Sequence, residues 1–140
     1  MSVKKIMSSP VITIDMDDRL STVNEIFLKN KFHHLLVVKN NMLFGVISDR
    51  DLLKALSPNI GTTAEKRHDK ATYNKRVHQV MNRDPICIEQ HHSIHAAIAL
   101  FLEKDITCIP VVDKKKRPVG IVSWRDILKA IQRPQVPKID

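Results

Sequence analysis

Two stretches of the chain decide the fold: residues 45–52 read Gly-Val-Ile-Ser-Asp-Arg-Asp-Leu, and residues 120–127 read Gly-Ile-Val-Ser-Trp-Arg-Asp-Ile. In both, a glycine and two β-branched residues are typical of a strand. The Ser-x-x-Asp that follows is a variant of the capping box, in which a hydroxyl and a carboxylate satisfy free amides at the start of a helix. A strand that runs directly into a capped helix is therefore predicted twice.

The similarity extends well beyond these two stretches. When the chain is displaced by 74 positions, Met7 aligns with Met81, and after one insertion near Arg117 the displacement becomes 75. A single gap across roughly fifty aligned positions indicates an internal duplication, which has to be recognised before the fold can be predicted.

Each copy is predicted to contain a short strand, a helix with apolar residues at 3–4 spacing, a hairpin with a polar turn, and a second helix. The predicted segments of the first copy are residues 11–14, 20–27, 35–38, 43–47 and 48–56, and those of the second are residues 86–88, 94–101, 109–112, 119–122 and 123–131.

The sequence therefore predicts an α+β (α/β) fold in which two pseudo-symmetric β-α-β-β-α repeats, residues 1–56 and 76–132, pack as one module. Residues 57–75 have few apolar side chains and are predicted to form an exposed linker. Residues 133–140, which include two prolines, are predicted to be a flexible tail.

The bulk composition narrows the class of protein. Hydrophobic residues make up 43% of the 140 positions, which suits a globular chain. A net charge of +8 favours anionic partners without choosing among them. No apolar run approaches the ~20 residues that a membrane span needs. Cys87 and Cys108 lie in apolar strand-like runs and are predicted to be buried free thiols, so a cytoplasmic location is expected.

The chain resembles a tandem pair of cystathionine-β-synthase (CBS) domains, also called a Bateman module. The resemblance rests on the two duplicated stretches, on Met7 and Met81 before the first strands, on strands ending in Val-Val, and on Ile109-Pro110-Val111-Val112. Leu36 departs from the pattern, because it stands where the first repeat would have proline.

This resemblance implies a regulatory, energy-sensing module rather than an enzyme. Such pairs bind an adenine nucleotide of the AMP, ADP or ATP class in clefts between the repeats, with no catalytic cofactor and no metal. The resemblance further implies a homodimer that signals to an effector protein. Leu52, Leu53 and Leu56 are the apolar helix residues expected to serve the dimer.

Carried over residue by residue, the resemblance implies two nucleotide sites, each joining a Ser–Asp pair from one repeat to residues of the other. One site combines Ser123 and Asp126 with Ile12, Phe32, His33 and His34. The other combines Ser48 and Asp51 with Ile86, Ile106, Thr107 and Cys108. Arg125 and Arg50, one residue before each aspartate, are candidate phosphate ligands because of their planar guanidinium groups.

Each of these residues also has a structural interpretation. Ser-x-x-Asp caps a helix in any case, while its carboxylate could also accept hydrogen bonds from a ribose diol. Ile12 and Ile86 could enclose a purine or belong to the core. Arg50 and Arg125 could bind phosphate or face solvent or a dimer partner.

The two sites are not equivalent in sequence. Asp49 follows the first motif serine and places a negative charge near any bound phosphate, whereas Trp124 follows the second. Phe32, His33 and His34 are bulky and could narrow the other site. One or both sites could therefore be degenerate, which would leave a structural or partner-binding CBS pair.

Other functions find less support in the sequence. Nucleic-acid binding agrees with the basic charge, but aromatic stacking platforms and known nucleic-acid motifs are absent from the sequence. The trio His91, His92 and His95 lacks a cysteine or acid to complete a convincing metal set. Neither cysteine has a paired base at a recognisable spacing, so nucleophilic catalysis is not predicted.

Overall fold

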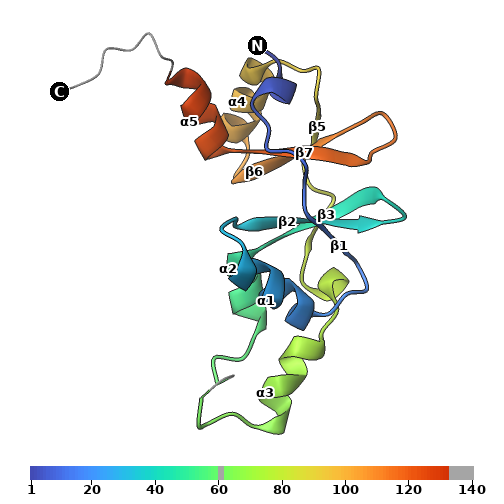
Figure 1. Cartoon of the computed structure of the whole chain (residues 1–140), viewed down its shortest axis with the longest axis vertical. Helices are drawn as coiled ribbons and strands as arrows, with labels where there is room; N and C mark the ends of the chain where they lie inside the picture. The colour runs from blue at the N-terminus through green and yellow to red at the C-terminus, as the bar shows by residue number, and fades with distance from the viewer. Residues whose placement is uncertain (60–61, 133–140) are drawn as a thin grey trace, which may run out of the picture. The chain divides into compact units, whose positions relative to one another are not determined.

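The computed structural model describes residues 1–59 and 62–132, which form two compact units (Figure 1). The first-repeat unit is Ile12–Pro85, and the second-repeat unit consists of Met1–Val11 together with the chain from Ile86 onward. Both units combine a β-sheet with helices, which confirms the predicted α+β class. The predicted tail, residues 133–140, lies outside the described residues.

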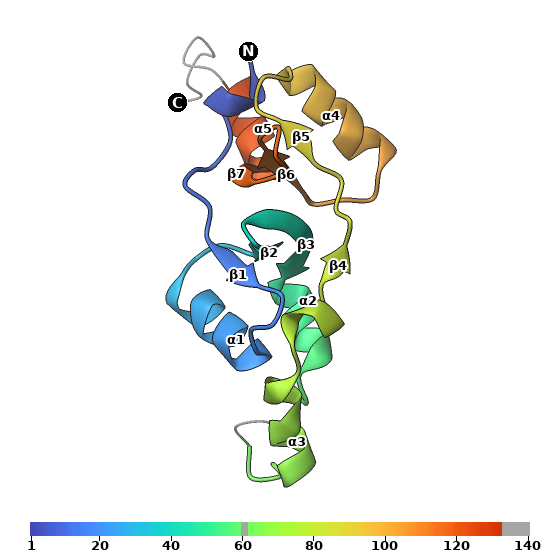
Figure 2. The same ribbon diagram turned by 90° about the vertical axis from the view of Figure 1, so that its right-hand side faces the viewer.

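The first-repeat unit contains a four-stranded sheet in the order β1-β2-β3-β4, in which β1 is parallel to β2 and the other pairs are antiparallel. Helices α1 and α2 lie on the same face of this sheet (Figures 1 and 2). The elements are β1 (Thr13–Asp15), α1 (Leu20–Lys29), β2 (His34–Lys39), β3 (Met42–Ser48), α2 (Asp49–Ala55) and β4 (Asn82–Arg83).

The second-repeat unit has the same plan, with a sheet in the order β5-β6-β7 and two helices on one face. Its elements are β5 (Ile88–Glu89), α4 (Ile94–Glu103), β6 (Cys108–Val112), β7 (Pro118–Ser123) and α5 (Trp124–Ile131). The predicted elements of each repeat are present in the predicted order. The first strand of each repeat begins two residues later than predicted, so Ile12 and Ile86 precede the strands.

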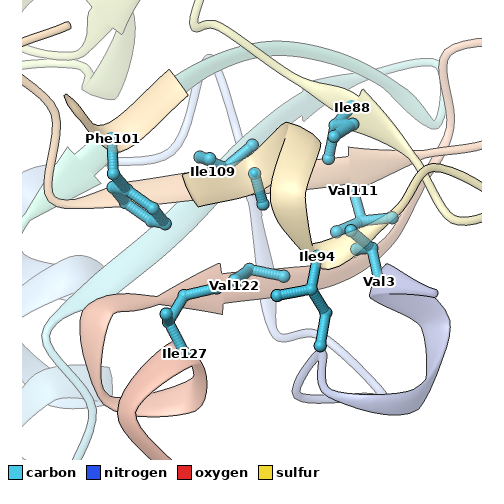
Figure 3. Packing of buried hydrophobic residues seen from close by; sticks show 9 residues of the cluster. Val3, Ile88, Ile94, Phe101, Ile109, Val111, Val122 and Ile127 are labelled. Carbon is cyan, nitrogen blue, oxygen red and sulfur yellow. The ribbon is translucent and has the colours of Figure 1, made fainter. Parts of the chain in front are cut away.

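Each unit has its own apolar core between the sheet and the helices, and the two cores use equivalent positions. Figure 3 shows the core of the second-repeat unit, where α4 contributes Ile94 and Phe101 and α5 contributes Ile127. The equivalent core of the first-repeat unit contains Leu20 from α1 and Leu52 from α2. Leu52 is therefore a core residue, 3% exposed, and the expectation that it serves a dimer face is wrong.

The first residues of each repeat join the sheet of the other repeat's unit. Strand β4, near the start of the second repeat, pairs antiparallel with β3 of the first. Ser8, near the start of the first repeat, pairs with Ile121 of β7, and each residue's N–H donates to the other's carbonyl oxygen at 2.8 and 3.1 Å. These two edge segments, residues 1–11 and 77–83, hold equivalent places in the two units.

The edge segments also contribute to the cores. Val3, in the 3₁₀ helix η1 (Val3–Lys5), is fully buried in the core of the second-repeat unit. Its counterpart Val77, in η3 (Val77–Gln79), is fully buried in the core of the first-repeat unit. The predicted repeat of residues 1–56 thus differs from the grouping in the structure, because apolar side chains near the N-terminus are buried among residues of the second repeat.

A methionine on each edge segment packs against a glycine of the neighbouring strand. A Cβ atom on Gly45 would lie 2.6 Å from Met81 Sδ and 2.9 Å from the carbonyl oxygen of Asn82. On Gly120 it would meet Sδ and Cγ of Met7. At Gly45 a side chain would meet the backbone of the edge segment, whereas at Gly120 the Met7 side chain would have to move.

Part of the predicted linker, residues 57–75, is folded. It contains α3 (Arg67–Ala71) and η2 (Thr72–Asn74), and the Asp69 side chain is buried within it. Asp69 accepts hydrogen bonds from Ser57 Oγ at 2.6 Å and from the Lys66 N–H at 2.8 Å. The sequence showed few apolar residues here, and the segment is instead organised around this polar group.

We predict that Gly45→Ala destabilises the protein by about 1–3 kcal/mol, the usual cost of overpacking a close contact, because the new methyl group meets the backbone of β4. Gly120→Ala is expected to cost less, since its nearest contacts are Met7 side-chain atoms that can rotate away. Chemical denaturation of both variants measures the difference. Equal destabilisation, or a larger effect at Gly120, would contradict this prediction.

Asp69→Asn is expected to lower the melting temperature at neutral pH. The hydrogen bond from Ser57, followed by that from the Lys66 backbone, lowers the pKa of the Asp69 carboxyl below its ordinary value of 3.8. Because the pKa is lower in the folded protein, the ionised carboxylate stabilises the fold at pH values above the pKa of the unfolded state. This contribution is lost as the pH falls through the pKa of the folded state. The difference in melting temperature between the two proteins should therefore shrink below about pH 4. A difference that does not depend on pH would show that the charge of Asp69 is unimportant.

Candidate ligand site

The first Ser-x-x-Asp motif caps helix α2. Ser48 is the last residue of β3, and its Oγ accepts a hydrogen bond from the Asp51 N–H at 3.0 Å. The Ser48 N–H donates to Asp51 Oδ2 at 2.9 Å, which completes the reciprocal capping box. The capping role predicted from the sequence is confirmed, and replacing such a cap by alanine typically costs ~1 kcal/mol.

The second motif caps helix α5 in the same way. The Asp126 N–H donates to Ser123 Oγ at 3.4 Å, and the Ser123 N–H donates to Asp126 Oδ2 at 2.9 Å. Ser123 Oγ also donates to Asp126 Oδ2 at 3.2 Å. Both serines and both aspartates are only half-buried, so the two caps are accessible from solvent.

Each of the two aspartates accepts these capping hydrogen bonds on only one of its two carboxylate oxygens. Within residues 1–59 and 62–132, the hydrogen bonds to Asp51 and Asp126 all fall on Oδ2. A carboxylate has two oxygens and about four acceptor positions. Oδ1 of each aspartate is thus left to accept a hydrogen bond from a ligand hydroxyl while the cap stays intact.

Asn82 contacts the first motif, and the sequence did not reveal this contact. It lies on β4, and its Nδ2 donates to Asp51 Oδ2 at 3.0 Å. The pairing of β4 with β3 brings it there from 31 positions away. Its counterpart in the repeat is Ser8, which pairs through its backbone with Ile121.

The residue after each motif serine also distinguishes the two units. His33 Nδ1 lies 2.8 Å from Asp49 Oδ2, and the Asp49 N–H donates to the His33 carbonyl oxygen at 3.0 Å. In the second unit, Trp124 instead packs on Phe101, with 5.0 Å between ring centroids. The first unit therefore has two carboxylates in the first turn of its helix, Asp49 and Asp51, whereas the second has only Asp126.

His34 lies opposite Ser48 in the β2–β3 ladder, and Cys108 lies opposite Ser123 in the β6–β7 ladder. Burial lowers the pKa of the His34 imidazole, and the opposing effect of Asp49 is smaller. The neutral ring is thus favoured in the fold, and its contribution to stability is lost as the pH falls. Each Ser–Asp pair lies beside strand residues of its own repeat, and its predicted combination with residues of the other repeat stays a prediction.

The predicted adenine-facing residues differ in their surroundings. Ile12 is 45% exposed and Ile86 is half-buried, so neither belongs to a core. Phe32 packs edge-to-face on Phe27 with 6.0 Å between centroids, and Ile106 packs against the second core. Phe32 and Ile106 therefore contribute to packing, whereas Ile12 is available to cover an apolar ligand surface.

The remaining predicted residues lie near the surface, apart from Cys108. Arg50, Arg125 and Thr107 are exposed, Cys108 is buried, and Cys87 is half-buried rather than buried as predicted. The two cysteines are not joined in a disulfide. His91 stacks on His92 and lies 3.3 Å from Glu89, but no group of three metal-ligating side chains occurs among the described residues.

The chain belongs to the CBS domain family. The family model described as CBS domain matches residues 3–58 and 77–133, which are the two repeats. A CBS domain-containing protein of Dictyostelium discoideum is 35% identical over 128 residues, which cover 90% of this chain and 88% of that protein.

A solved structure has the same fold. The CBS domain pair of protein MJ0100, determined in complex with 5′-methylthioadenosine and S-adenosyl-L-methionine, matches 94% of this chain and 95% of that one. The TM-score is 0.74 and the sequence identity is 28%. The chain is therefore a tandem pair of CBS domains with the predicted α+β architecture.

CBS pairs are regulatory modules, and they also occur as parts of enzymes. The inosine-5′-monophosphate dehydrogenase of Methanocaldococcus jannaschii is 30% identical over 135 residues, and the match covers 96% of this chain but only 24% of that enzyme. The similarity to this chain thus concerns about a quarter of the enzyme's length. In the described part of the chain, no helix has the length and apolar character needed to cross a membrane.

Proposed function

We propose that this protein is a regulatory module that binds an adenosine-containing ligand, such as AMP, ADP or ATP, at its two Ser-x-x-Asp motifs. The observation that carries the proposal is the spare Oδ1 atom of Asp51 and Asp126, since Oδ2 holds the helix cap. A carboxylate in this position can accept a hydrogen bond from a ribose hydroxyl. The adenosine-type ligands of the related MJ0100 pair support this choice of ligand class.

Three further features fit the proposal. Ile12 is exposed before β1, where an apolar side chain can cover a purine ring. Arg50 and Arg125 lie one residue before the motif aspartates, and their exposed guanidinium groups suit phosphate. Free thiols at Cys87 and Cys108 agree with the proposed cytoplasmic location, where thiols are kept reduced.

We also propose that the protein acts as a homodimer and passes its signal to an effector protein. Helix α5 exposes an apolar stripe that consists of Trp124, Leu128 and Ile131, which are 42%, 59% and 62% exposed. Leu53, the counterpart of Leu128 on α2, is 73% exposed. Side chains spaced by three or four residues lie on one helix face, and a face of this kind is suited to self-association.

The ligand is tested by thermal unfolding with AMP, ADP, ATP, S-adenosylmethionine and NAD. A ligand at a hundred times its Kd adds about 2.7 kcal/mol, which should raise the melting temperature by about 5–10 °C. We expect Asp51→Asn and Asp126→Asn each to reduce the shift, since an asparagine carbonyl can keep the cap while its NH₂ group cannot accept from a ribose hydroxyl.

Asp105→Asn, an exposed change in the second-repeat unit, is the matched control and should keep the full shift. No shift with any of the five compounds would contradict the proposal. A full shift that persists when both motif aspartates are changed would also contradict it.

The dimer is tested by sedimentation. The wild-type protein is expected to sediment at twice the chain mass of 16.0 kDa, and Leu128→Glu at the mass of one chain. Lys129→Gln, at the exposed neighbouring position, is the control and should stay dimeric. A wild-type monomer, or a dimer that survives Leu128→Glu, would exclude this face.

A further inference from the structure

The turn between β6 and β7 has a concentrated positive charge. Residues 113–117 read Asp-Lys-Lys-Lys-Arg, and the four basic side chains are exposed. Arg117 Nε donates to Asp113 Oδ2 at 2.7 Å, so one of these charges is paired. Lys114, Lys115 and Lys116 form no ion pair with any carboxylate in residues 1–59 or 62–132.

Asp113 fixes the conformation of this turn. Its Oδ1 accepts hydrogen bonds from the N–H groups of Lys115 and Arg117, both at 2.9 Å. Its own N–H donates to the Arg117 carbonyl oxygen at 3.0 Å, and its carbonyl oxygen accepts from the Lys116 N–H at 3.0 Å. The backbone hydrogen bond from Arg117 is the largest of the effects that lower the pKa of the Asp113 carboxyl, so the ionised form persists. The three lysines therefore project from an ordered backbone.

One backbone position of this turn has a conformation that favours glycine or asparagine, but a lysine occupies it. Lys116 has φ of 63°, in the left-handed region that glycine and asparagine adopt at least cost. In the equivalent turn of the first repeat, the residues with positive φ are Asn40 and Asn41. Lys39, the last residue of β2 before that turn, is paired with Asp17 at 2.6 Å. The same turn thus has a neutral tip in the first repeat, whereas in the second it has three lysines that form no ion pair within the described residues.

We propose that the 113–117 turn, called here the basic turn, docks an acidic segment of a partner polypeptide. Three neighbouring ammonium groups on an ordered backbone match a short cluster of Asp or Glu side chains, because the charges are complementary and the turn is already ordered before binding. This inference rests on the proposed function, in which the signal passes to a partner protein, and it places that partner on the second-repeat unit.

Nucleic acid fits the basic turn less well than an acidic polypeptide. Three lysines neutralise at most about three phosphates, whereas nucleic-acid binding at physiological salt draws on roughly six or more such contacts. The turn itself carries no aromatic side chain on which a base could stack.

The test uses the full chain and a fluorescein-labelled polyglutamate peptide, with fluorescence anisotropy as the readout. The variant K114Q/K115Q/K116Q removes the three unpaired charges, and K4Q/K104Q/K129Q removes three scattered exposed lysines of the same unit. Both variants change the net charge from +8 to +5 (8 − 3 = 5). We expect the first variant to bind the peptide about tenfold more weakly and the second to bind within about threefold of wild type.

Equal weakening of both variants would show that binding follows net charge, and would overturn the proposal. Absence of peptide binding at low salt would also overturn it, as would tighter binding of DNA oligonucleotides that is lost in K114Q/K115Q/K116Q. The thermal shift with nucleotide is recorded on the same samples and should be unchanged in both variants. A missing shift in the wild type would refute the nucleotide proposal, independently of the peptide result.

Discussion

The contact between a methionine of an edge segment and a glycine of the adjoining strand is the constraint on which the two units depend. Met81 lies on Gly45 and Met7 lies on Gly120, so that each sheet is completed by residues from the start of the other repeat. Val77 and Val3, four residues earlier in each segment, are fully buried in the same cores. Neither repeat therefore completes its sheet and core from its own contiguous sequence.

The exchange of edge segments between the two repeats also affects the candidate ligand site. Asn82, the first residue of β4, comes directly after Met81. Its side-chain amide donates to the carboxylate of Asp51, which belongs to the capping box of α2. The cap orients the Asp51 carboxylate so that Oδ2 accepts the capping hydrogen bond and Oδ1 remains available to a ligand. In the second unit, the backbone of Ser8 takes the place of β4, and Asp126 is held by Ser123. The two motifs are thus alike in their caps and differ in their neighbours.

The repeat, the order of elements and both helix caps could be predicted from the sequence, since they depend on local patterns such as Ser-x-x-Asp and apolar spacing. The exchange of edge segments could not, because the equivalent residues Val3 and Val77 fit either core by size and polarity. Asn82 was missed for the same reason, as its role depends on long-range pairing. The helical part of residues 57–75 was missed because it is organised around the buried carboxylate of Asp69 rather than around apolar residues.

The completion of each unit by the other repeat's edge segment is tested most directly by amide hydrogen exchange on a protein that lacks residues 1–8. The Ile121 N–H donates to the Ser8 carbonyl oxygen, so amides of β7 should exchange faster in the truncated protein. Amides of β3 in the first-repeat unit should keep their protection, because their edge partner β4 is still present. Unchanged protection of β7 would contradict the conclusion that the N-terminal segment completes the second-repeat unit.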